Sequence, residues 1–313
     1  MTGLGASSAG DPSAEVPALA QGEMAYQARR TRVRQVMGRV LMYCLLIVIA
    51  ATFLLPIAWM LSSSLKYDAQ VYTIPPSFIP RPVRLANYPE ALAYLPWGTY
   101  LYNTMVRYAL PSVVGVLLSC SVVAYGFSRL QWRGRDVLFF VCIATMMIPY
   151  QVTMIPLFIL YKRLGWVNTY LPLTVIAFFG SPYLIFMFRQ FFLGIPSELS
   201  DAARIDGCSE MGILVRIIVP LAKPAYAVAA LFQFMYVWHD YLGPLIYLSK
   251  KDLRVVAIGL AFMRDQLFFR AAQGQSYPYL MAMASVFAVP IILLFFLAQR
   301  TFIEGVALTG LKG

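Results

Sequence analysis

Charged residues are scarce in this chain of 313 residues: Asp, Glu, Lys and Arg together make up 12% of it, whereas soluble domains carry about 25%. Apolar residues make up 60% of the sequence, and aromatic residues make up 15%. A soluble enzyme of this length needs a hydrated exterior, and the chain has too few charged side chains to build one. The composition therefore predicts a membrane protein that crosses the bilayer several times.

Residues suited to catalysis and metal binding are also scarce. Histidine occurs once, at His239, and the four cysteines (Cys44, Cys120, Cys142 and Cys208) form no Cys-x-x-Cys pair. We therefore predict no metal site, no catalytic residues and no enzymatic activity in this chain. No lysine follows a glycine, so the phosphate-binding loop G-x-x-x-x-G-K-[ST] is absent, and nucleotide chemistry must take place in another chain.

Uncharged runs of about 20 residues, the length that crosses about 30 Å of hydrocarbon, occur six times. They span residues 40–61, 108–127, 137–161, 164–188, 224–248 and 279–299, and only His239 and Asp240 interrupt the fifth. We predict an all-α integral membrane protein with six transmembrane helices. Pro149 and Pro156 are expected to kink the third helix.

Positive charge sets the expected orientation. The net charge is +11, and arginines cluster beside apolar runs, as in the leader before residue 40 and in the segment Arg129–Arg135. This pattern places the N-terminus in the cytoplasm, and an even number of spans returns the C-terminus there. Because the basic residues are explained by topology, we expect no nucleic-acid partner.

The chain divides into two predicted parts. Residues 1–38 are rich in Gly, Ala, Ser, Pro and Arg, and they predict a disordered basic cytoplasmic leader. The first apolar run is too long for a secretory signal peptide, whose core has about 7–15 residues. Residues 39–313 form the predicted six-helix transmembrane domain. Two outer segments, residues 66–98 and 249–276, are longer than a turn, and six prolines in the first argue against a regular helix there.

The segment of residues 195–220 predicts a helix–turn–helix on the cytoplasmic side. Ser197 is expected to cap its first helix, and Gly207 permits the turn. The second helical piece, Met211–Val219, is expected to end before Pro220. Two interpretations are open: an amphipathic connector that rests on the lipid headgroups, and a docking knob for a soluble partner.

The same segment contains Asp201-Ala-Ala, then three residues, Gly207, nine residues, and Ile217-Ile-Val-Pro220. This pattern resembles the EAA loop, EAA-x3-G-x9-I-x-LP, of permease subunits in binding-protein-dependent ABC importers. Asp201 replaces Glu, and Val219 replaces Leu. Other parts of the chain resemble the sugar-importer branch, of maltose G-subunit (MalG-like) type: Asn103-Thr-Met, residues 124–130 with Gly134-Arg135, and residues 147–156, 164–169 and 237–244. His239 departs from that branch, which usually has Asn there.

The resemblance implies a type I ABC importer permease fold with a cytoplasmic EAA coupling helix, in a bacterial plasma (inner) membrane. It implies four partners besides the lipid: a second permease subunit of a different sequence, two ATPase subunits that bind ATP and Mg, and an extracytoplasmic solute-binding protein. No cofactor is expected in this chain. The residues implied to couple to the ATPase are Glu198, Asp201, Ala202, Ala203, Asp206, Gly207 and Pro220.

Asp240 marks a second candidate site, because a carboxylate at mid-bilayer costs about 2.5–3.5 kcal/mol and should face protein or water. In one interpretation the fifth span ends at Trp238, and the residues after it lie at the outer interface. In the other, a translocation path is lined by aromatic faces for sugar rings and polar groups for hydroxyls. Its candidate residues are Gln233, Tyr236, Trp238, His239 and Asp240.

With the resemblance, these features predict a permease subunit that forms half of the translocation pathway for a carbohydrate, either a sugar, an oligosaccharide or a polyol. Separate subunits would hydrolyse ATP. The alternative is a nucleotide-independent secondary transporter or channel. Inverted repeats with broken helices in both halves would favour that alternative, and the sequence shows no convincing repeat.

Overall fold

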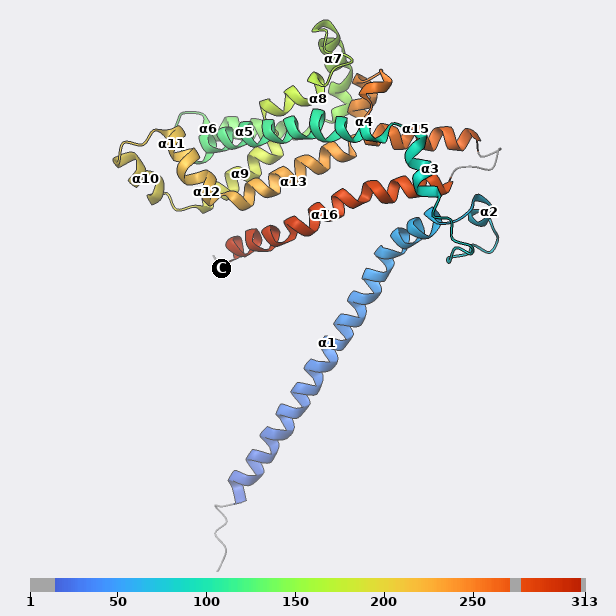
Figure 1. Ribbon diagram of the computed structural model, residues 1–313. Helices are drawn as coiled ribbons and strands as arrows, with labels where there is room; N and C mark the ends of the chain where they lie inside the picture. The colour runs from blue at the N-terminus through green and yellow to red at the C-terminus, as the bar shows by residue number, and fades with distance from the viewer. Residues whose placement is uncertain (1–14, 271–276, 311–313) are drawn as a thin grey trace, which may run out of the picture. The chain divides into compact units, whose positions relative to one another are not determined.

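The computed structural model describes the backbone of residues 15–270 and 277–310 and the side chains of residues 34–266 and 277–299. All regular structure in these ranges is helical (Figure 1). The chain divides into two compact units, Met1–Trp59 and Met60–Gly313, and each is described by itself.

The first unit consists of the long helix α1 (Glu15–Ser64), whose last residues belong to the second unit. The apolar part, Arg34–Ser64, has a mean hydropathy of 2.7, and the apolar side chains along it are exposed. The predicted first run, residues 40–61, lies inside this helix, which is long enough to cross a bilayer. The predicted leader, residues 1–38, overlaps α1 from Glu15 onward, whereas residues 1–14 lie outside the described part, so the boundary at residue 38 stays a prediction.

Three further apolar stretches in the second unit are long enough to cross a membrane: Trp97–Ser128, Leu171–Gly194 and Tyr277–Gln299. The first comprises α4 (Trp97–Tyr102), η1 (Asn103–Ala109) and α5 (Leu110–Ser128); the second comprises α8 (Leu171–Thr174), η3 (Val175–Phe179) and α9 (Pro182–Gly194); the third is part of α16 (Tyr277–Gly310). The first of these stretches begins before the predicted run 108–127, and the third agrees with the predicted run 279–299 to within two residues. The predicted run 164–188 begins too early, because residues 164–170 form the turn between α7 and α8.

The third predicted run is not one continuous helix. It is divided into α6 (Arg135–Ala144) with η2 (Thr145–Met147), and α7 (Tyr150–Arg163), which meet at an angle of 95°. Pro149 lies at the break in an extended conformation, as expected for a residue without a backbone N–H. Pro156 lies inside α7 and does not end it.

The fifth predicted run, residues 224–248, is also wrong as a single helix. The helical stretch Glu210–Leu221 contains α11 (Glu210–Ile213), η4 (Leu214–Ile218) and α12 (Val219–Leu221), and it bends by 83° into α13 (Lys223–His239). The chain then turns at Asp240 and forms a separate helix, α14 (Leu242–Tyr247). Among the described residues there are therefore four helices long enough to span a bilayer, or six spans if each bent pair counts as one.

The two predicted outer segments contain mainly short elements. They are α2 (Asp68–Val71), α3 (Asn87–Tyr94), η5 (Lys251–Leu253) and α15 (Val256–Arg270). Asn103, part of the Asn103-Thr-Met sequence, is fully buried, and its amide donates to the carbonyls of Asp252 and Arg254 at 2.8 and 2.9 Å. The Thr104 hydroxyl accepts from the N–H of Val256 at 3.0 Å. These two residues therefore fasten the start of α15 to η1.

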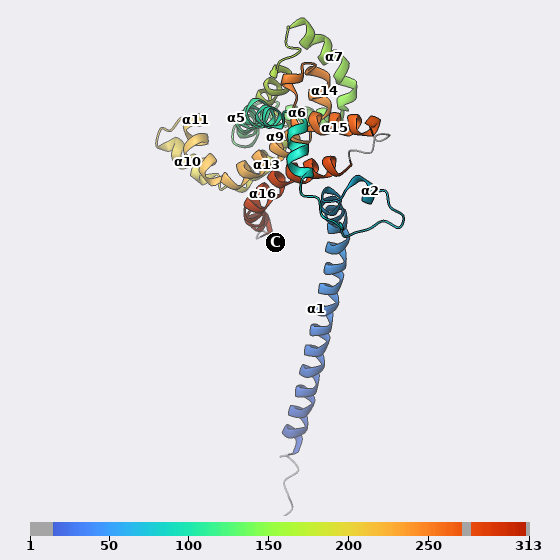
Figure 2. The ribbon, with the colours of Figure 1, turned by 45° about the vertical axis from the view of Figure 1, so that its right-hand side comes forward.

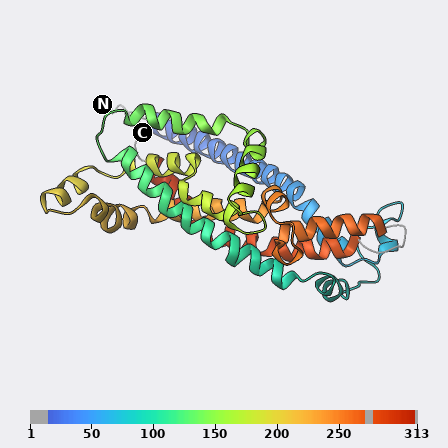
Figure 3. The same cartoon turned by 90° about the horizontal axis from the view of Figure 1, so that it is seen from above.

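The core of the second unit is built around α5, which packs against α9 and α13. Phe188, Phe192, Ile213 and Ile218 are fully buried in it, so the apolar faces of α9, α11 and η4 hold one another in place. In all three views the short helices α10 (Glu198–Ile205), α11 and α12 lie at one end of this unit, and α15 lies at the other (Figure 1, Figure 2, Figure 3). The first candidate site lies at the end that contains α10, α11 and α12.

Candidate functional site

The 195–220 segment forms the predicted helix–turn–helix. After α10 the chain reverses through Gly207, whose φ of +78° is unfavourable for any residue with a Cβ. Five of the predicted residues are exposed on α10 and its turn: Glu198, Asp201, Ala202, Asp206 and Gly207. Ala203 points inward and belongs to the same buried cluster as Ile213, so one face of α10 rests on the bundle and the other is open.

Two details of this segment differ from the sequence prediction. The Ser197 side chain makes no capping hydrogen bond; the cap is at Ser209, whose hydroxyl accepts from the N–H of Gly212 at 3.2 Å. Pro220 is exposed and does not end the second piece, which continues to Leu221. Pro220 lies one residue before the end of the helical stretch Glu210–Leu221, so the stretch ends within two residues of the predicted boundary.

Arg204 closes the turn between α10 and α11. Its guanidinium pairs with Glu210 at 2.7 Å and with Asp201 at 2.7 Å. The Tyr125 hydroxyl of α5 donates to the other oxygen of Glu210 at 2.5 Å. Hydrogen bonding to Glu210 is the largest cause that raises the pKa of Arg204 above its ordinary value. We call these four residues the turn brace; it connects the exposed helix α10 to the end of a membrane-spanning helix.

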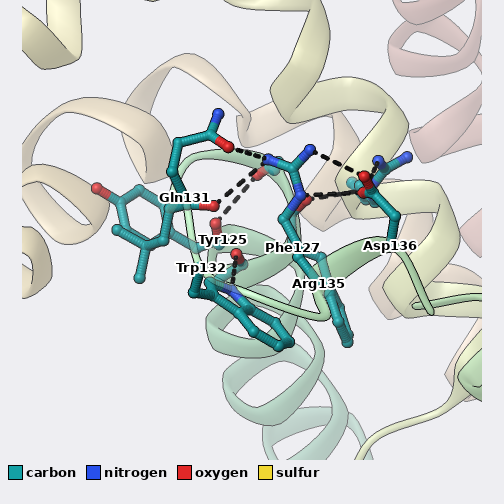
Figure 4. A network of polar contacts seen from close by, with 10 residues as sticks. Tyr125, Phe127, Gln131, Trp132, Arg135 and Asp136 are labelled. Atoms are coloured by element: carbon teal, nitrogen blue, oxygen red, sulfur yellow. Dashed lines mark hydrogen bonds and ion pairs between the residues drawn. The ribbon is translucent and has the colours of Figure 1, made fainter. Parts of the chain in front are cut away.

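The loop after α5 supports the same end of the bundle. Arg129 donates to the backbone carbonyls of Phe192 and Ile195, and it thereby holds the start of the 195–220 segment. Figure 4 shows Arg135 between Gln131, at 3.2 Å, and Asp136, at 3.0 Å. These contacts hold the loop after α5 in place, and through Arg129 they hold the start of the 195–220 segment.

Large apolar side chains are exposed around the turn. Ile205 is 87% exposed, and Leu199 and Met211 are exposed as well. A cluster of exposed apolar residues next to the acidic side chains of Glu198 and Asp206 is typical of a protein interaction surface. The sequence analysis did not identify these three residues.

The turn brace was also missed. Arg204 and Glu210 are six residues apart with a turn between them, and Tyr125 comes from a different helix. The spacing of Asp201 and Arg204, three residues on a helix, is the one signal in the sequence that indicates a part of it.

The second candidate site is a cavity of about 590 Å³ in the second unit. Its lining includes five tyrosines, which come from η1, α7, α13 and α14: Tyr108, Tyr150, Tyr161, Tyr236 and Tyr247. Its volume is within the range of about 300–1,000 Å³ found for small-molecule sites. We call it the tyrosine cavity.

Asp240 contributes a carboxylate to the lining of the tyrosine cavity. One of its oxygens accepts a hydrogen bond from the Tyr108 hydroxyl at 2.6 Å, and the other accepts from the N–H of Gly243 at 3.0 Å. A Cβ at Gly243 would lie 2.6 Å from the carboxylate. The glycine therefore makes room for Asp240 at the start of α14.

The structure separates the five predicted path residues. Gln233, Tyr236 and Asp240 line the tyrosine cavity. Trp238 is 6% exposed and stacks on Phe234 in a core cluster, and His239 is exposed, with its Nδ1–H donating to the carbonyl of Met235. The helical period explains this division, because residues 233 and 236 share one face of α13 whereas residue 238 lies on the opposite one; Asp240 follows the end of α13.

The sequence analysis did not identify the other four tyrosines of the cavity, because they lie far apart in the sequence and only the fold brings them together. Among the residues whose side chains are described, no group of three or more His, Cys, Asp or Glu is placed to hold a metal ion.

Comparison with known proteins identifies the family. The family described as binding-protein-dependent transport system inner membrane component matches residues 113–307. The arabinooligosaccharides transport system permease protein AraQ of Halalkalibacterium halodurans is 38% identical over 224 residues, which cover 72% of this chain and 76% of that protein. The protein of the same name from Bacillus subtilis is 32% identical over 282 residues, which cover 88% of this chain and 96% of that protein.

The fold of this chain is similar to that of a protein of known structure. It is a crystal structure of a bacterial ABC transporter involved in the import of the acidic polysaccharide alginate. One of its chains matches with a TM-score of 0.73 at 24% identity, over 85% of this chain and 96% of that one. The match to the family covers more than half of the sequence, and the relatives are matched over most of their length. The chain therefore belongs to the family of inner-membrane components of binding-protein-dependent transport systems.

Proposed function

We propose that this chain is the permease subunit of an ATP-driven importer of a carbohydrate and forms half of its translocation pathway. The second half belongs to another permease subunit of different sequence, and two ATPase subunits supply the energy. An extracytoplasmic binding protein delivers the solute. Membership of the family and the names of the relatives support this assignment.

The observation that carries the proposal is the exposed helix α10, held on the end of the bundle by the turn brace. Glu198 at its start, Asp206 directly after its end and its exposed Ile205 offer a surface for a partner with a basic rim and an apolar cleft. Asp201, Ala203 and Gly207 shape this surface by pairing with Arg204, by packing inward and by reversing the chain.

The arrangement of the chain in the membrane follows from this assignment. The end with α10–α12 faces the cytoplasm, each bent helix pair counts as one of six spans, and both termini are cytoplasmic. Residues 1–38 then form the leader, and residues 39–313 form the permease domain of a bacterial inner-membrane protein. The tyrosine cavity, with Gln233, Tyr236 and Asp240, lies on the solute's path.

The proposal is tested by crosslinking in the purified complex of this chain with the products of the neighbouring transporter genes. All four native cysteines are replaced, and Ile205→Cys is introduced. A short bifunctional thiol–amine crosslinker is expected to join it to the ATPase subunit. The matched control is Ile74→Cys, since Ile74 is also strongly exposed, at 96%, and lies in the segment between α2 and α3.

Uptake in proteoliposomes is measured on the same protein, with the binding protein and labelled arabino-oligosaccharides. The binding protein and the labelled sugar are placed on one side of the proteoliposome membrane, and ATP is placed on the other side. This ATP is expected to drive uptake of the sugar. If an ion gradient alone drives uptake, or if Ile205→Cys captures the ATPase no better than Ile74→Cys, the proposal is wrong and a secondary transporter or channel is favoured.

A further inference from the structure

The tyrosine cavity has an unbalanced charge. Among the residues whose side chains the structure describes, Asp240 is the one ionisable carboxylate in the lining, and no lysine, arginine or histidine lines the cavity. The remaining polar groups are the amide of Gln233, the hydroxyl of Ser181 and the phenol groups of the tyrosines. A solute that enters this space therefore meets neutral donors and acceptors and a single negative charge.

The fold secures the position of this charge. The Asp240 carboxylate accepts from Tyr108, which is 2% exposed, and from the N–H of Gly243. Neither donor is a cation, so neither cancels the charge. A Cβ at Gly243 would lie 2.6 Å from the carboxylate and 2.9 Å from Leu173, so a glycine at this position leaves the carboxylate its place beside Tyr108.

The aromatic lining suits uncharged sugar rings. Tyr161 and Tyr247 lie edge to face with their ring centres 5.4 Å apart, and Tyr236 is 62% exposed on the cavity side of α13. Aromatic faces pack against the apolar faces of a sugar ring, whereas phenol, amide and carboxylate groups pair with its hydroxyls.

From these observations we propose that the tyrosine cavity is a binding site for neutral carbohydrates that rejects acidic ones through the Asp240 carboxylate. Two negative charges a few ångströms apart in a partly desolvated site repel strongly, because water screens them poorly. A uronate or sulfonate group would also find no basic partner in the lining. This inference rests on the proposed function, and it names the class of solute that the subunit selects.

The experiment measures binding to the purified complex in detergent, without the binding protein, so that only the membrane subunits select the solute. The two probes are labelled arabinotriose and labelled trigalacturonate, used in equilibrium dialysis. The wild-type complex is expected to bind arabinotriose at least about tenfold more tightly. Asp240→Asn is expected to reduce this preference about tenfold or more, since it removes the charge and keeps an oxygen and an N–H₂ group for Gly243 and Tyr108.

Asp265→Asn is the matched control. Asp265 is an exposed carboxylate on α15 that pairs with Arg264, so its replacement changes the net charge equally and should leave the preference unchanged. If Asp240→Asn does not yield a folded complex, Gln233→Glu provides the second variant, because it adds a carboxylate of the same shape to the lining and is expected to increase the preference for arabinotriose.

The outcomes separate this inference from the proposed function. A wild-type complex without preference, or an Asp240→Asn complex with wild-type preference, overturns the inference, even where ATP-driven uptake shows that the proposed function is right. A complex that shows no ATP-driven uptake of any sugar refutes the proposed function, and binding of arabinotriose in dialysis would then still report on the cavity itself.

Discussion

Replacement of Gly207 by alanine offers the sharpest test of the turn after α10. The backbone there has a φ of +78°, and a Cβ added to it would have no heavy atom within 4 Å. The substitution is therefore free of steric clash, and its cost is the strain of a left-handed conformation, about 1–2 kcal/mol. That energy corresponds to a reduction of about 5- to 30-fold in the ratio of native to non-native turn.

If the turn must be formed for α10 to engage the ATPase, Gly207→Ala should lower ATP-driven uptake in proteoliposomes by up to this factor. Gly207→Asn should lower it less, because asparagine tolerates the left-handed region better than alanine. The ATPase activity of the complex, measured in parallel, is expected to become less dependent on the solute-loaded binding protein.

Gly165 provides a matched control. It has a φ of +70° and also has no heavy atom within 4 Å of an added Cβ, but it follows α7 and lies outside the 195–220 segment. Gly165→Ala should therefore cost similar stability and leave coupling intact. Equal uptake by the Gly207→Ala and Gly165→Ala complexes would refute the role assigned to the turn.

Three further predictions concern the turn brace and the core. Glu210→Gln removes the charge that pairs with Arg204. Because both side chains are partly exposed, we expect a local loss of stability of about 1 kcal/mol and more ATP hydrolysed per solute imported. An unchanged ratio of ATP hydrolysed to solute imported would count against the turn brace. Phe188→Ala should lower stability by about 3–5 kcal/mol, since Phe188 is fully buried, and a thermal unfolding curve in detergent that coincides with the wild-type curve would contradict this. Gly259→Ala should lower stability by about 1–3 kcal/mol through overpacking, because its Cβ would lie 2.6 Å from the Tyr100 ring. Gly98→Ala is the control, because open space surrounds Gly98. Equal melting temperatures of the two variants would refute the packing argument.

The sequence predicted the features that depend on local chemistry. Apolar runs indicated most of the long helices, Pro149 indicated the break between η2 and α7, and Gly207 indicated the turn after α10. Where a polar residue could either interrupt a span or end it, the sequence left both interpretations open. At Asp240 the backbone leaves the helix, because the carboxylate accepts the N–H of Gly243 and starts α14.

The two candidate sites were predictable to different degrees. The 195–220 segment is continuous in the sequence, so its exposed residues could be named, whereas the contribution of Tyr125 required knowledge of how α5 and α11 pack. The tyrosine cavity is discontinuous: Tyr108, Tyr161 and Tyr247 lie far apart along the chain. The spacing of Tyr236 and Asp240, four residues apart and so on one face of a helix, was the signal visible beforehand.

The helix α13 connects the two candidate sites directly. It begins at Lys223, one residue after the bend that follows α12, and it ends at His239, beside the carboxylate of Asp240. Its 17 residues make a rod of about 25 Å. With the bend as pivot, a tilt of about 5° shifts the far end of a rod of that length by about 2 Å. If α10 binds an ATPase subunit as proposed, a shift at the bend would therefore also move the end of α13 next to the tyrosine cavity, where Gln233, Tyr236 and Asp240 lie.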